Sequence, residues 1–346
     1  MVNITILLPF FFAVLIPFLH RMFNKKLHIG WFVLFLPAII FIFLLQYIPI
    51  TTAGNTLTSE FKWLPSYGIN FTTYVDGLSL LFGLLITGVG SLVILYSIFY
   101  MSRAREELHN FYVYLMLFMG AMLGVVFSDN VIVLYVFWEL TSISSFLLIA
   151  YWYQRKKSRE GARKSMLITI FGGLSMLAGL LLLSIITDTY SIREMISQAK
   201  SLPEDVLFLP AMILILLGAF TKSAQFPFSL WLPDAMEAPT PISAYLHSAT
   251  MVKAGIYLVA RLTPLFGGDA VWFWTVSLVG IVTLLYGSWN AVRQKDLKAL
   301  LAYSTISQLG LIMSLLGLGS AAIYFGYGDE SKVYAIAIMA AVFHLV

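Results

Sequence analysis

Ten long apolar windows, each close to the length of a membrane span, constrain this chain more than any other feature. They lie at roughly 3–20, 28–48, 77–100, 110–128, 131–152, 165–187, 206–225, 241–263, 271–291 and 299–318, and an eleventh begins near 333. A helix needs about 20 mostly apolar residues to cross a bilayer. Because helices satisfy all their backbone polar groups internally, windows of this length predict an all-α polytopic membrane protein with about ten or eleven spans.

The composition agrees with a membrane protein and excludes several other classes. The chain is 60% hydrophobic and only 11% charged, whereas soluble domains contain about 25% charged residues. It has no cysteine, and its five histidines show no metal-ligand spacing. We therefore expect no cofactor, no metal site and no catalytic set, and the chain indicates a transporter component more than an enzyme.

The basic residues report topology rather than nucleic-acid binding. Fourteen of the 21 follow windows one, three, five and nine, and five lie on the alternate side: Lys62, Arg193, Lys200, Arg261 and Lys332. The other two lie within spans. The positive-inside rule then places the N-terminus outside, and the first window is expected to be a retained helix because its positive residues follow the apolar run.

Several connections carry their own signals. Residues 50–75 predict a small hairpin, and SIREMISQAK within 188–205 predicts a short amphipathic helix. Asp76 before GLSLLF predicts an N-cap.

The last apolar run has about 14 residues and rises about 21 Å, short of a hydrocarbon core of about 30 Å. A C-terminally truncated chain is therefore expected.

The segment 218–255 contains four prolines within fifteen residues. Pro227 has no N–H and leaves the carbonyl of Ser223 without its helical donor, so the seventh helix is predicted to break just after Lys222. Broken helices at membrane depth expose backbone groups to ions in transporters. Pro239 and Pro241 are predicted to begin the following helix, where proline is tolerated.

Lys222 and Glu139 are charges at predicted membrane depth. Desolvation opposes the charged form of a lysine there, so Lys222 can gain and lose a proton; the alternative is that it snorkels to an interface. Glu139 lies nine residues into its span, about 12 Å deep, and must face a partner or a wet cavity. The predicted partner is Lys222, and a purely structural ion pair is the alternative.

The eighth span adds His247 and Lys253. On a continuous helix they would lie about 240° apart, with Thr250 three residues from each as a possible hydroxyl relay. A satisfied core histidine is the competing interpretation of His247. Asp234 and Glu237 would lie at the inner membrane face, either collecting protons or cations or serving as solvated surface carboxylates.

The segment TKSAQFPFSLWLPDAMEAPTPISAYLHSATMVKAG resembles the signature of the antiporter-like subunits shared by respiratory complex I and the Mrp multisubunit Na+/H+ antiporters. YVDGLSLLF, YVFWELTS and DLKALLAYSTISQLG extend the resemblance over nearly the whole chain. Lys253 in HSATMVKAG and the run PDAMEAPTP are most similar to the largest membrane component of Mrp antiporters. One departure is visible: where the family usually has histidine in QFPFHxWLP, this chain has Ser229.

The resemblance implies a fold of two inverted five-helix repeats. It divides the chain into N-terminal helices over 1–109, a first repeat over 110–263 and an incomplete second repeat over 264–346. It also implies a proton half-channel that uses Glu139, Lys222, His247 and Lys253, with His344 at the start of a second half-channel.

The sequence therefore predicts a proton- and cation-translocating subunit of a multisubunit Na+/H+ antiporter in a bacterial cell membrane. Its expected partners are other membrane subunits, protons, Na+ or another cation, and the lipid bilayer, with no nucleic acid. The alternatives are a proton-pumping subunit of an NADH:quinone oxidoreductase and a purely structural scaffold in such a complex.

Overall fold

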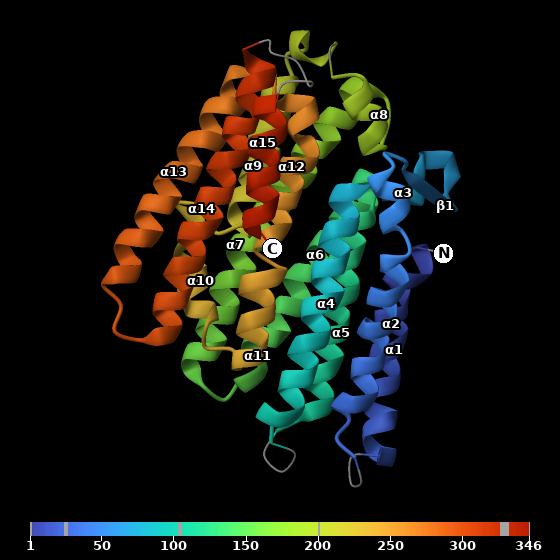
Figure 1. Ribbon diagram of the computed structural model, residues 1–346, viewed down its shortest axis with the longest axis vertical. Helices are drawn as coiled ribbons and strands as arrows, with labels where there is room; N and C mark the ends of the chain where they lie inside the picture. Colours follow the sequence, from blue (N-terminus) through green and yellow to red (C-terminus); the bar gives the residue numbers. More distant parts are fainter. Residues whose placement is uncertain (1, 24–26, 103–105, 200, 326–331, 346) are drawn as a thin grey trace. The chain divides into compact units, whose positions relative to one another are not determined.

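The computed structural model describes residues 2–23, 27–102, 106–199, 201–325 and 332–345. Within them, eight helical stretches are long and apolar enough to cross a membrane. The predicted polytopic all-α class is therefore confirmed (Figure 1). Five basic residues used in the topology prediction lie outside the described part of the chain: Lys25, Lys26, Arg103, Arg105 and Lys200.

The chain divides into two compact units. The first is formed by Met1–Met166 with Glu237–Met251, and the second by Leu167–Met236 with Val252–Val346. The first unit contains α1 (Val2–Phe23), α2 (Gly30–Leu45), α3 (Ile48–Thr52), β1 (Leu57–Leu64), η1 (Pro65–Tyr67), β2 (Ile69–Val75), α4 (Gly77–Tyr100), α5 (Leu108–Phe127), α6 (Val131–Ile149), η2 (Ala150–Trp152), the beginning of α7 (Lys156–Thr187), α11 (Thr240–Ser243) and η5 (Ala244–Ala249).

Helix α5 forms the core of the first unit. It packs against α1, α4 and α6, and most of its residues are buried, as expected for a helix that is apolar all round. Phe11 and Val14 of α1 are exposed, and this outward apolar surface suits contact with lipid.

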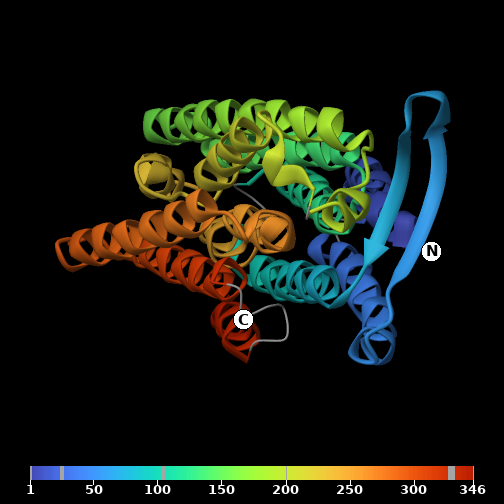
Figure 2. The same cartoon turned by 90° about the horizontal axis from the view of Figure 1, so that it is seen from above.

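The predicted hairpin is confirmed (Figure 2). β1 and β2 pair antiparallel, with Leu57 opposite Val75. Gly68 follows η1 with a φ of +70°, a backbone conformation that glycine adopts without strain. Its carbonyl accepts a hydrogen bond from Asn130 Nδ2 at 3.0 Å, which ties the tip of the hairpin to the start of α6.

The predicted N-cap at Asp76 is also confirmed. Asp76 Oδ1 accepts a hydrogen bond from the Ser79 backbone N–H at 2.9 Å, and Ser79 Oγ accepts one from the Asp76 backbone N–H at 2.9 Å. This reciprocal pair satisfies donors that the first turn of a helix leaves unpaired, so α4 begins immediately after the hairpin.

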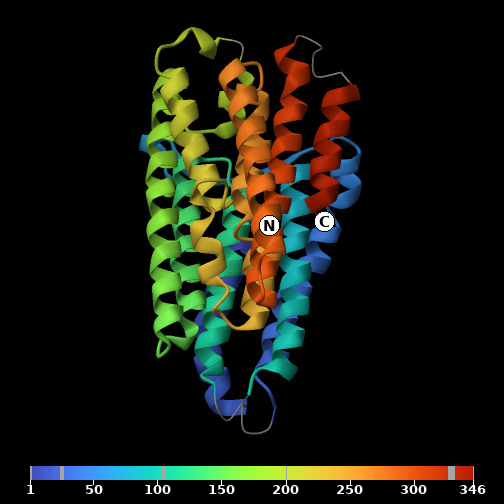
Figure 3. The same cartoon turned by 90° about the vertical axis from the view of Figure 1, so that its left-hand side faces the viewer.

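The second unit contains the remainder of α7, α8 (Ile192–Ser197), η3 (Leu202–Glu204), α9 (Phe208–Lys222), η4 (Phe228–Leu230), α10 (Trp231–Ala235), α12 (Lys253–Phe266), α13 (Ala270–Val292), α14 (Leu297–Tyr324) and α15 (Lys332–Leu345). The short helix predicted within 188–205 is confirmed as α8. Helices α14 and α15 lie side by side (Figure 3).

Small residues bring α13 and α14 into close contact. Side chains added at Gly280, Gly287 or Gly317 would meet backbone atoms of the facing helix. Close approach through small residues is the packing mode that membrane helices favour, because lipid supplies no hydrophobic driving force between them.

Two expected helix boundaries differ from the structure. Helix α7 begins at Lys156 rather than near 165, because its basic first turns extend the helix beyond the apolar stretch. The expectation of one continuous eighth span over 241–263 is wrong: this stretch is divided among α11, the π-helical turn η5 and α12. Pro239 and Pro241 do begin α11, as predicted.

Candidate ion-translocation site

Lys222 is the last residue of α9, and its side chain is completely buried. The final α-helical bond runs from the Ser223 N–H to the Ala219 carbonyl at 2.9 Å. Beyond it the backbone turns, with Ala224 at a φ of +48°, and the chain continues through η4 into α10. The predicted break directly after Lys222 is therefore confirmed.

Side chains of the second unit hold the broken segment in place. The Phe226 N–H donates to Thr283 Oγ1 at 2.9 Å, and Trp231 Nε1 donates to the Thr221 carbonyl at 3.0 Å. Pro227 has no N–H to donate to the Ser223 carbonyl. This carbonyl instead accepts a hydrogen bond from Gln225 Nε2 at 3.1 Å. Backbone groups freed by the break thus find partners inside the protein, as membrane depth requires.

Two further polar atoms in this segment are buried without such partners. Gln225 Oε1 and Ser229 Oγ are hidden from solvent, and neither is hydrogen-bonded to the residues that the structure describes. Buried polar groups are nearly always paired with protein or ordered water. The segment therefore provides two sites suited to bound water, one at Gln225 and one at Ser229.

Lys253 begins α12 at a second helix break. Thr250 leaves the helical conformation, with φ −133° and ψ −77°, and α12 then starts at Lys253. The Lys253 side chain is half-buried.

The two breaks meet inside the second unit. Ser223 Oγ donates to the Val252 carbonyl at 2.6 Å, and Gly255 lies against the Ala219 carbonyl and Ser223 Oγ. Lys222 directly precedes Ser223 in the chain, and Lys253 directly follows Val252. The end of α9 and the beginning of α12 thus bring the two lysine positions to one place, a juxtaposition that the sequence did not predict.

Glu139 and His247 belong to the first unit. Glu139 is half-buried near the middle of α6, and its Oε1 atom is hidden from solvent. The hydroxyls that follow it bond to their own helix: Thr141 Oγ1 donates to the Trp138 carbonyl at 2.6 Å and Ser144 Oγ to the Leu140 carbonyl at 2.6 Å. The pairing of Glu139 with Lys222 stays a prediction.

His247 is buried in the π-helical turn η5. Tyr245 anchors this turn to α4 by donating from Oη to the Ile86 carbonyl at 2.9 Å. Thr250 Oγ1 donates to the Tyr245 carbonyl at 2.7 Å, so its proton is directed back into the turn. The relay from His247 through Thr250 to Lys253 stays a prediction, but the separation calculated for a continuous helix does not apply.

The remaining predicted residues are more accessible. Asp234 is exposed in α10, Glu237 is half-buried, and His344 is exposed in the last turn of α15. Their suggested roles at an entrance or in a second half-channel stay predictions. Among the residues that the structure describes, no group of three or more His, Cys, Asp or Glu side chains could hold a metal ion.

These features define a polytopic α-helical membrane protein with interrupted spans and lysines beside the interruptions. Comparison with known proteins gives the same class. The model described as NADH:quinone oxidoreductase/Mrp antiporter, TM matches residues 128–328, and the model described as NADH-Ubiquinone oxidoreductase (complex I), chain 5 N-terminus matches residues 63–112. The chain belongs to the NADH:quinone oxidoreductase/Mrp antiporter transmembrane family, as its sequence motifs indicated.

Two curated relatives are named as components of Na(+)/H(+) antiporters. The chain is 66% identical over 98% of its length to such an antiporter subunit from Alkalihalophilus pseudofirmus, and 59% identical over all of its length to one from Staphylococcus aureus. It spans 42% and 43% of the lengths of these relatives.

Two solved structures share the fold. The Mrp complex from a Dietzia species matches 99% of this chain with a TM-score of 0.87 and 34% identity, and 36% of the matched chain is covered. An archaeal membrane-bound sulfane sulfur reductase complex matches 99% of this chain with a TM-score of 0.85 at 24% identity, covering 68% of the matched chain. The second likeness concerns the fold alone.

Proposed function

We propose that this chain forms part of a proton- and cation-translocating subunit of a multisubunit Na+/H+ antiporter. The observation that carries the proposal is the meeting of two helix breaks through Ser223 and Val252, with Lys222 and Lys253 as their immediate neighbours. Charged residues inside membrane spans are costly and mark ion or proton pathways. Interrupted helices in transporters expose polar backbone groups to ions.

The two lysines lie at opposite kinds of helix end. Lys222 is at the C-terminus of α9, where the helix dipole favours positive charge, whereas Lys253 is at the N-terminus of α12, where the dipole opposes it. A proton moving between the two positions would pass between unequal electrostatic environments. The hidden polar atoms of Gln225 and Ser229 offer places for water in the broken segment that follows Lys222.

In the proposed path, Glu139 modulates Lys222, and the proton continues through the eighth span, where Thr250 bridges His247 and Lys253. Asp234 and Glu237 collect ions at an entrance, and His344 begins a second half-channel. The protein works in the cell membrane beside other membrane subunits, with its N-terminus outside. The names of the relatives at 66% and 59% identity favour antiport over a role in an NADH:quinone oxidoreductase.

The test is Na+/H+ exchange in everted vesicles that contain the complete complex. Lys222→Ala or Glu139→Gln should lower exchange by about a hundredfold, the lower range for losing a positioned proton-transfer group. Lys157→Ala, at an exposed position, is the control and should exchange normally. Unchanged exchange by Lys222→Ala at normal expression would contradict the proposal.

A scaffold role makes a different prediction. A buried ion pair can often be replaced by packed apolar residues without loss of stability. If Glu139 and Lys222 only hold helices in register, replacing both by leucine should preserve exchange. In the proposed path the double variant should be as inactive as either single variant.

A further inference from the structure

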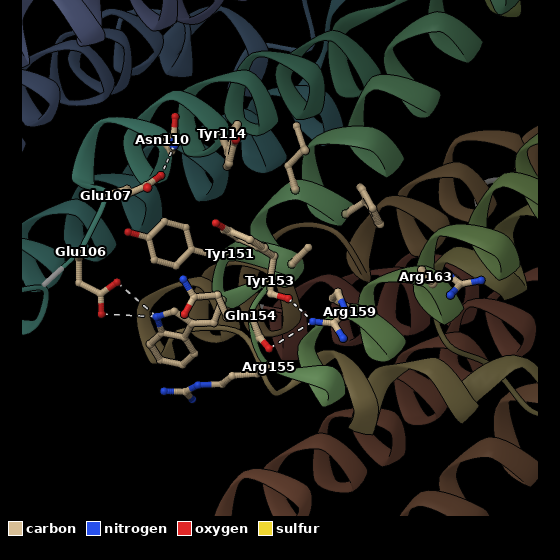
Figure 4. A pocket seen from close by; sticks show the side chains of 14 residues that line it. Glu106, Glu107, Asn110, Tyr114, Tyr151, Tyr153, Gln154, Arg155, Arg159 and Arg163 are labelled. Atoms are coloured by element: carbon tan, nitrogen blue, oxygen red, sulfur yellow. Dashed lines mark hydrogen bonds between the residues drawn. The ribbon is translucent and has the colours of Figure 1, made fainter.

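A cavity of about 580 Å³ lies at one end of α6 in the first unit, and no residue of the proposed proton path lines it. Its size is within the range of small-molecule sites. Three short stretches line it: the start of α5 with the two residues before it, the end of α6 with η2, and the first turns of α7 with the preceding turn (Figure 4).

One wall of the cavity carries carboxylates. Glu106 accepts a hydrogen bond from Trp152 Nε1, with distances of 3.2 and 3.4 Å to its two oxygens. Glu107 Oε2 accepts one from Asn110 Nδ2 at 2.6 Å. Neutral donors thus fix both carboxylates in position.

The other wall carries guanidinium groups. Arg155 lies over the Trp152 ring with its Cζ 4.0 Å from the centroid, and Arg159 donates from Nη1 to the Tyr153 carbonyl at 2.7 Å. The Arg163 side chain makes no hydrogen bond or ion pair with the described residues. In Figure 4, Arg159 and Arg163 lie on the opposite side of Tyr151 from Glu106 and Glu107. None of the three arginines forms an ion pair within the described part of the chain.

The cavity lies at the end of a candidate membrane span, where lipid headgroups are expected. A candidate membrane span ends at Trp152, and Phe146, Leu147 and Ala150 from its last turns contribute an apolar surface to the cavity. Trp152 and Tyr153 are aromatic residues of the kind enriched at the membrane–water interface. A ligand here would meet apolar side chains at one end and charged groups at the other.

We propose that this cavity binds the headgroup of an aminophospholipid, which carries a phosphate and a primary ammonium. The guanidinium groups suit the phosphate, because Arg recognises phosphate with paired N–H donors. The carboxylates of Glu106 and Glu107 suit the ammonium. A lipid with negative charge alone would satisfy the arginines but meet repulsion at the carboxylate wall, and a choline headgroup has no N–H to donate to it.

Native mass spectrometry of the purified, delipidated complete complex tests the site. Phosphatidylethanolamine should bind about tenfold more tightly than phosphatidylglycerol or phosphatidylcholine of the same acyl chains, a difference equal to one charge-assisted hydrogen bond. Equal binding of the three lipids would overturn the proposal. So would equally tight binding of soluble glycerophosphoethanolamine, which would show a site for a free headgroup compound.

Variants locate the site and separate its two walls. Arg163→Gln should weaken binding of all three lipids about tenfold, and Glu107→Gln should remove the preference for phosphatidylethanolamine. Lys157→Gln and Glu160→Gln are matched controls, because they remove the same charges from exposed positions of α7 outside the cavity. If the cavity variants bind lipid as these controls do, the proposal fails. If a variant does not assemble, the comparison of the three lipids on the unsubstituted complex still tests the proposal.

Discussion

Ser223 shows how much one small residue contributes to this fold. It directly follows the buried Lys222, its backbone N–H closes the last turn of α9, and its hydroxyl reaches the Val252 carbonyl in the other break. A larger side chain could not occupy this place, because Gly255 of α12 lies against the same oxygen. The position of Lys222 relative to α12 therefore depends on this serine.

Ser223→Ala should weaken the junction between the two breaks. Loss of one buried hydrogen bond costs about 1 kcal/mol, and we expect Na+/H+ exchange by the complete complex to fall about two- to fivefold. The matched control is Ser184→Ala, because Ser184 Oγ donates only to the Leu180 carbonyl of its own helix, at 2.8 Å. An equal effect of the two substitutions would show that the junction has no special part in transport.

Sequence alone revealed the charged residues of the candidate site but not their supports. Lys222 and Glu139 are conspicuous because a charge inside a long apolar run is rare and costly. Ser223 and Gln225 have no such signal, since serine and glutamine occur throughout loops and helices. Their importance comes from burial and hydrogen bonding, which depend on contacts between distant segments.

At the scale of elements, the two helix breaks were not equally predictable. Pro227 predicts the end of α9, because proline cannot donate the helical hydrogen bond. The stretch AYLHSATMV between α11 and α12 contains no proline or glycine, and its apolar periodicity favours a continuous helix. The structure instead has the π-helical turn η5 and a break at Thr250. Tertiary contacts, including that of Tyr245 with α4, stabilise this local departure.

Gly255→Ala should separate the start of α12 from the end of α9. An added methyl group would meet the Ala219 carbonyl oxygen and Ser223 Oγ, and overpacking of this kind costs about 1–3 kcal/mol. We expect a lower thermal unfolding midpoint for the purified complex. At Gly268 of the same unit, the nearest atom to an added methyl group is Ile323 Cγ2 at 3.8 Å. Gly268→Ala should therefore leave the midpoint unchanged, and equal midpoints for both variants would contradict the packing argument.

At the scale of the whole molecule, apolar windows predicted most of the spans because length and composition are sufficient signals at membrane depth. The seventh window and the eighth lack a long continuous helix in the structure. Three of the residues predicted to transfer protons lie in these two windows: Lys222, His247 and Lys253. The two windows that do not form a long continuous helix are thus the ones that contain the lysines of the candidate site.

The proposed orientation of the chain rests on its charge distribution and can be measured directly. Lys62 in β1 and Lys157 in α7 are both exposed, and the three spans α4, α5 and α6 separate them along the chain, so they should lie on opposite sides of the membrane. The chain contains no cysteine. In intact cells, a membrane-impermeant maleimide should label Lys62→Cys but not Lys157→Cys, because basic connections remain inside. Everted vesicles should give the reverse pattern. Labelling of Lys157→Cys from outside would invert the proposed topology and would place the charged cavity beside α6 on the outer side.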